Sequence, residues 1–93
     1  MRFVRGLAKH LPIINQVAIR KQIRSVTIQD GVKKIEYEAF YDCEKLEHIH
    51  IPRSVKFIGF GVFTGCPNLT IHAPAGSCTE QYAKEHNIPF VAE

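Results

Sequence analysis

The chain has 93 residues, of which 45% are hydrophobic and 23% charged, and its formal net charge is +3. This length allows one small domain, and the apolar content is sufficient for a core, which argues against global disorder. No stretch is apolar over the length that a membrane span requires, and none has the layout of a secretory signal peptide.

The charge is divided unevenly along the chain. The segment from Met1 to Gln29 holds six basic residues and no acidic one, whereas the remainder holds six basic and nine acidic residues. Apolar residues in the basic segment recur at helical spacing, which predicts a helix over about residues 11–22. This stripe consists of Leu7, Leu11, Ile14, Val17 and Ala18. We expect residues 1–22 to form a basic segment whose helix covers one end of the domain.

Two consecutive stretches share one apolar skeleton at a spacing of 23 residues, while most of the polar residues between them differ. A fixed period of this length is typical of a solenoid, in which each unit buries its apolar face against the next. The first set is Val26, Ile28, Val32, Ile35, Phe40, Cys43 and Leu46, and the second is Ile49, Ile51, Val55, Ile58, Phe63, Cys66 and Leu69.

Each repeat is expected to begin with a short strand. Ile49 and Ile51 alternate with His48 and His50, which predicts a strand with one face inward. Pro52 ends this strand because proline has no N–H group for a further ladder bond.

The rest of each repeat returns the chain to the next strand. Val55 and Ile58 are expected along a second edge, and Phe63 and Cys66 fit a tight helical turn with both side chains inward. No C-x-x-C pair occurs among the three cysteines, so we interpret all three as thiols. Stacked repeats leave a disulfide between Cys43 and Cys66 sterically possible.

The C-terminal part departs from the repeat after a third strand that begins at Leu69. Ser77 and Glu80 have the spacing of a capping box, which predicts a helix after Ser77. Asn87 fits the left-handed position after the end of this helix, and residues 88–91 are expected to pack back. The side chains expected to face the repeats are Cys78, Tyr82 and Ala83.

The run from Ile49 to Leu69 reads I-x-I-P-x-S-V-x-x-I-G-x-x-x-F-x-x-C-x-x-L and resembles the BspA-type leucine-rich repeat. Residues 26–46 follow the same pattern, with Glu36 where the family usually has glycine. The ending from Gly76 resembles the segment that often closes such arrays, so the resemblance covers about residues 23–93.

This resemblance implies an α/β fold, namely a short leucine-rich-repeat solenoid with a C-terminal helical cap. Its expected parts are repeats 23–45 and 46–68 and a terminal cap 69–93, preceded by the segment 1–22. Family members are often surface proteins that bind other proteins or cells. The resemblance therefore implies a protein-interaction module at the cell surface or secreted, although the chain as written carries no export signal.

The outward strand positions form our candidate contact surface, arranged as two columns across the repeats. One column is Ser25, His48 and Thr70, and the other is Thr27, His50 and His72. Neighbouring strands lie about 4.8 Å apart, so His50 and His72 are expected side by side. Three imidazoles on one face can bind Zn²⁺ or Ni²⁺ weakly or respond to pH. Since no carboxylate or thiol is evidently placed to complete a shell, we favour a solvated face without metal.

No residue pattern predicts catalysis or a cofactor. Cys43 and Cys66 occupy inward positions, and the glycines of residues 59–65 lack the frame of a phosphate-binding loop. We therefore expect a non-enzymatic chain with a protein partner, a possible homodimer through an end of the solenoid, no nucleic acid and no membrane span. The alternatives are a structural terminal piece of a longer array, or a basic N-terminal segment that binds a membrane surface or nucleic acid.

Overall fold

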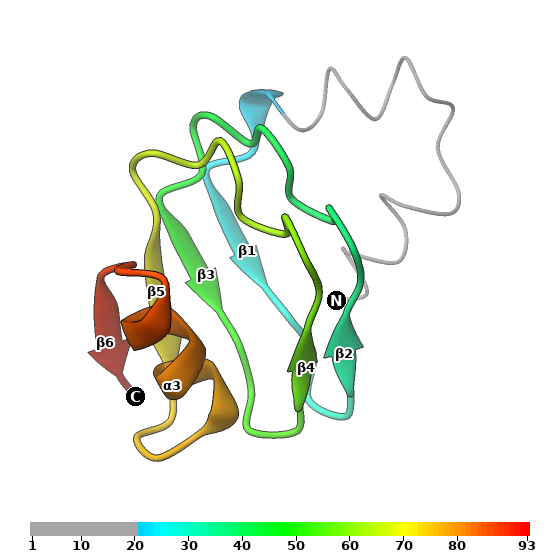
Figure 1. The fold of residues 1–93 in the computed structure, drawn as a ribbon, viewed down its shortest axis with the longest axis vertical. Coiled ribbons are helices and arrows are strands. Elements are labelled where there is room, and N and C mark those ends of the chain that lie inside the picture. Colours follow the sequence, from blue (N-terminus) through cyan, green and yellow to red (C-terminus); the bar gives the residue numbers. More distant parts are fainter. Residues whose placement is uncertain (1–20) are drawn as a thin grey trace.

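The structure is a computed structural model and describes residues 21–93. Within this range, four parallel strands form one sheet in the order β1-β3-β5-β6 (Figure 1). They are β1 (Ser25–Thr27), β3 (His48–His50), β5 (Thr70–Ala73) and β6 (Phe90–Ala92). The chain thus has the parallel strands and the terminal helix of the predicted α/β class. The helix predicted over residues 11–22 lies outside the described residues, except for Lys21 and Gln22, which are helical.

The first three strands follow the period of the sequence. Val26 pairs with Ile49, its equivalent in the next repeat, and Ile49 pairs with Ile71, which lies one position short of a full period. All three side chains are buried, at 1%, 0% and 0% exposed. The predicted alternation of inward apolar and outward polar residues is therefore confirmed on this sheet.

A second, shorter parallel sheet lies across the core from the first (Figure 1). It consists of β2 (Lys34–Ile35) and β4 (Phe57–Ile58), and Ile35 pairs with Ile58. Near this sheet, the Ser54 side chain of the second repeat is hydrogen-bonded to the backbone of the first. Its hydroxyl accepts a bond from the Gly31 N–H at 3.0 Å and donates to the Val32 carbonyl at 2.9 Å. The predicted second edge is thus a real sheet.

In each repeat, the turn that follows the short strand β2 or β4 buries a phenylalanine ring in the core. Phe40 and Phe63 are 0% and 7% exposed, and their rings stack with centroids 6.0 Å apart. Hydrogen bonds between residues three apart hold both turns, from the Cys43 N–H to Phe40 and from the Cys66 N–H to Phe63. This confirms the predicted tight turn, although Cys66 is only half-buried.

The helix α3 (Cys78–Glu85) contacts β4, β5 and β6 and so covers the C-terminal end of the repeats (Figure 1). Ser77 caps it as predicted, since the Ser77 Oγ accepts from the Glu80 N–H at 3.2 Å. The Glu80 carboxylate accepts a bond from the Gly76 N–H at 2.6 Å, one residue earlier than a capping box requires. Asn87 has φ 56°, the predicted left-handed conformation.

The inward face of α3 differs by one residue from the prediction. Ala83 is fully buried and Tyr82 half-buried, as expected, but Cys78 is exposed. Thr79 takes the inward position, because it lies one turn before Ala83 on the same face of the helix. The prediction that Cys78 faces the repeats was therefore wrong.

Residues 88–91 do pack back onto the core, where Ile88 and Phe90 are partly buried. The chain goes further than expected, because residues 90–92 form the strand β6, which pairs with β5 in parallel. The Glu93 N–H then donates to the Ala73 carbonyl at 3.0 Å. This added strand brings the end of the described chain next to β3 and β5.

Candidate binding face and histidine cluster

The strand register places the six predicted surface residues in the two expected columns. Ser25 pairs with His48 and His48 with Thr70, and Thr27 pairs with His50 and His50 with His72. Ser25, Thr27 and His48 are exposed, and the other three are half-exposed. We call this set, namely Ser25, Thr27, His48, His50, Thr70 and His72, the strand face. Its placement is confirmed, and its binding role stays a prediction.

Two of the histidines of the strand face, His48 and His50, both contact the third, His72. The His50 and His72 rings stack with centroids 4.5 Å apart, as their neighbouring strands led us to expect. His48 reaches diagonally across to the same residue, with its Nδ1 2.9 Å from the His72 Nε2. The central ring, His72, thus contacts both of the others.

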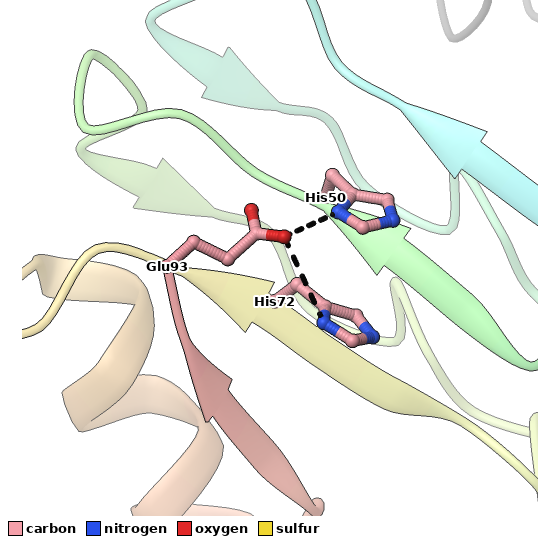
Figure 2. Close-up of side chains that lie close together, drawn as sticks. All are labelled: His50, His72 and Glu93. Carbon is pink, nitrogen blue, oxygen red and sulfur yellow. Dashed lines mark hydrogen bonds and ion pairs between the residues drawn. The ribbon is translucent and has the colours of Figure 1, made fainter.

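Glu93 joins this cluster and corrects the expectation that no carboxylate lies near the histidines. Its Oε2 lies 2.8 Å from the His50 Nδ1 and 3.8 Å from the His72 Nδ1. Figure 2 shows both ring nitrogens turned toward the same carboxylate oxygen. Glu93 follows β6, whose pairing with β5 brings it here. Sequence reasoning missed it because Glu93 lies beyond the periodic part of the chain.

Burial and charge determine the protonation of the cluster. Partial burial lowers the pKa of His72, the neighbouring His50 and His48 lower it further, and Glu93 opposes them. The lowered pKa favours the neutral imidazole of His72. An ionised carboxylate only accepts hydrogen bonds, so the His50 Nδ1 carries the proton that it shares with Glu93.

Two ion pairs connect the start of the described chain to the following repeat. Lys21 pairs with Glu44 at 3.5 Å, and Arg24 pairs with Glu47 at 3.6 Å. Each pair joins equivalent positions of successive repeats, and all four side chains are at least half exposed. Such pairs contribute at most about 1 kcal/mol each. However, the two ion pairs engage Lys21 and Arg24, which are two of the six basic residues in the segment from Met1 to Gln29.

The cysteines are thiols, as predicted. The Cys66 thiol donates to the Phe40 carbonyl at 3.2 Å, which links neighbouring repeats through their turns. The hydrogen bond with Cys43 lowers the pKa of Cys66, and burial opposes this shift. Cys78 is exposed on α3, away from this pair.

The sequence was compared with models of known protein families. The model of the BspA type leucine rich repeat region, which describes six copies, matches residues 10–84. The match begins at residue 10, earlier than the resemblance over about residues 23–93. A search of curated proteins and a search of solved structures found no significant match to the chain. Within residues 21–93, no helix is long and apolar enough to cross a membrane. The chain belongs to the family of BspA-type leucine-rich repeat proteins.

Proposed function

We propose that the chain is a short leucine-rich-repeat solenoid that acts as a non-enzymatic protein-interaction module, with the strand face as its contact surface. One observation carries this proposal, namely the parallel register that aligns polar side chains in two columns over a fully buried apolar row. Family membership supports the coarser part, since leucine-rich repeats commonly serve protein binding and are generally not enzymes.

The chemistry of the strand face suits a folded protein partner. Hydroxyl and imidazole groups both donate and accept hydrogen bonds, and the stacked rings of His50 and His72 add flat apolar area. Neither column contains Lys, Arg, Asp or Glu, and the neighbouring Glu93 carboxylate is already hydrogen-bonded to His50. The backbone beneath is fixed by the sheet, which lowers the entropy lost on binding.

The variant with both His50→Ala and His72→Ala tests the proposal. A photoreactive amino acid at Thr27 identifies the partner, and the affinity of the purified partner is then measured by surface plasmon resonance in the presence of EDTA. We expect the double variant to bind at least ten-fold more weakly, because it loses the central pair of the face.

Glu44→Ala is the matched control, since it removes an exposed side chain outside both columns. It should bind like the wild type. Equal affinities of the wild type and the double variant would remove the strand face as the contact surface.

A basic N-terminal binder of membranes or nucleic acid remains the alternative with the least support. Lys21 and Arg24 already contact Glu44 and Glu47 of the next repeat, which reduces the free positive charge of this region. Binding through such charges falls steeply with salt, so an affinity for vesicles or nucleic acid that disappears at high ionic strength would favour it.

A further inference from the structure

Three side chains from neighbouring strands converge on one point beside the strand face. We propose that His50, His72 and Glu93 bind a divalent transition-metal ion, Zn²⁺ foremost, which fastens the end of β6 to β3 and β5. The atoms that these residues offer as ligands all lie within 4.8 Å of one another. Each ligand comes from a different part of the sheet, since His50 ends β3, His72 lies within β5 and Glu93 follows β6.

Two of the separations between the ligand atoms lie near those of a zinc site. A tetrahedral Zn²⁺ with bonds of about 2.0 to 2.1 Å places its ligand atoms about 3.3 Å apart. The Glu93 Oε2 lies 2.8 Å from the His50 Nδ1 and 3.8 Å from the His72 Nδ1, on either side of that value (Figure 2). Glu93 is 46% exposed, so its side chain can shift, and the stacked imidazoles need to turn so that both lone pairs point at one ion.

The hydrogen bond between His72 and His48 is compatible with the His72 tautomer that a metal ligand needs. Its Nε2 lies 2.9 Å from the His48 Nδ1, and in the tautomer with the proton on Nε2 this group donates to His48 and leaves the Nδ1 lone pair available to a metal. Metal-binding histidines usually donate their second ring N–H to such a partner. His48 is therefore a positioning residue and not a ligand.

At His50, the metal replaces a proton. The His50 Nδ1 donates to the Glu93 carboxylate in the metal-free chain. When Zn²⁺ binds, the neutral ring takes the tautomer with its proton on Nε2, which frees the Nδ1 lone pair, and both groups become ligands.

The set of donor atoms favours Zn²⁺ over the hard cations. Two imidazole nitrogens and one carboxylate oxygen are a set that Zn²⁺ uses with water at the fourth position, whereas Ca²⁺ and Mg²⁺ prefer oxygen ligands alone. The cluster is partly open to solvent, with His50 35% and His72 16% exposed, so an ion can enter and keep a water ligand.

Calorimetric titration of the full, untagged chain with ZnCl₂ tests the site. We expect one Zn²⁺ per wild-type chain, and an affinity at least ten-fold lower for His50→Ala, His72→Ala and Glu93→Gln. His48→Ala should weaken binding by about ten-fold, the usual effect of losing an outer hydrogen-bond partner. His86→Ala and Cys78→Ser are the matched controls, since each removes an exposed donor outside the cluster, and both should bind like the wild type.

Two further measurements keep the result decisive. Zn²⁺ should shift the ring NMR signals of His50 and His72 but not those of His86. It should also raise the melting temperature of the wild type relative to EDTA, and not that of the His50→Ala variant. If the His72→Ala variant does not fold, the His50→Ala and Glu93→Gln variants still test the site, because these two side chains are more exposed.

A wild-type chain that takes up no Zn²⁺ would overturn the proposal. So would ligand variants that bind like the wild type, or binding that is lost in Cys78→Ser or His86→Ala. No partner protein is present in this titration, and the partner assay contains EDTA. The metal site and the interaction function can therefore fail independently.

Discussion

Gly59 and Glu36 occupy equivalent positions in successive repeats but have different surroundings. A Cβ atom on Gly59 would lie 2.7 Å from the backbone nitrogen of Tyr37 and 3.0 Å from its Cα. The Gly59 N–H also donates to the Ile35 carbonyl at 2.9 Å. Glu36, in contrast, is exposed. The glycine of the repeat is therefore explained by the close approach of the preceding repeat.

Replacing Gly59 by Ala should destabilise the chain by about 1 to 3 kcal/mol, because the new methyl group meets backbone that cannot turn away. Glu36→Ala is the control at the equivalent position and should change stability by less than about 0.5 kcal/mol. Urea unfolding followed by circular dichroism measures both values. If the two variants unfold at the same urea concentration, the contact between the repeats is looser than described.

At the scale of the element, the stability of α3 depends on the Glu80 carboxylate at its N-terminal cap. The Gly76 N–H donates to the Glu80 carboxylate, which lowers the pKa of Glu80 below its usual value of 4.5, and Lys84 contributes to the same shift. A carboxyl group with a lowered pKa in the folded state stabilises that state above its unfolded pKa. This stabilisation is lost as the pH falls through the folded-state pKa.

We therefore expect Glu80→Gln to reduce the stability of the chain at pH 7 and to reduce it less at pH 3, where more of the wild-type carboxyl is protonated. Thermal unfolding at the two pH values checks this. Ser77→Ala removes the other capping bond without removing a titratable group, and it should cost about 1 kcal/mol at both pH values. A Glu80→Gln deficit of the same size at pH 3 and pH 7 would contradict the assignment.

The elements that could be predicted are those that the repeat or a local motif specifies. The apolar period determined which side chains of β1 and β3 point inward, and Ser77 with Glu80 located the start of α3. The prediction failed at Cys78 because a capping motif defines where a helix begins but not which of two adjacent residues faces the core. That choice depends on how the whole helix packs.

The candidate site was predictable only in part for a related reason. His50 and His72 lie on strands of the periodic region, so their contact followed from the register. Glu93 follows a short edge strand, and a segment of this kind carries little periodic signal. Its pairing with β5 depends on the preceding helix, so the carboxylate could be found only in the structure.

At the scale of the whole molecule, the two ends of the described repeats differ. The C-terminal end carries α3 and β6, which contact the last repeat. The opposite end begins with Ile23, which is 8% exposed, and the family match extends back to residue 10. Repeat proteins need a polar cover at each end, because an uncovered repeat presents its apolar face to water.

The sequence predicts two ways to cover the N-terminal end, namely the segment 1–22 or a second copy of the chain, and a reversible dimer in sedimentation velocity over a concentration series would indicate the second copy. Circular dichroism of the same samples should show folded chain throughout. A folded species of 10.6 kDa at every concentration would show instead that the segment 1–22 covers that end itself. High salt should leave the dimer intact if apolar surface holds it together.

The contact between His50 and Glu93 also has a consequence for the order of folding. It joins residues 43 positions apart, whereas the bond between His48 and His72 spans 24. Doubling the length of a closed loop costs about 0.6 kcal/mol in entropy, so the longer contact is the less favourable one to form first. It requires β5, α3 and β6 to be in place. The imidazole of His50 is therefore a natural reporter that β6 has docked on β5.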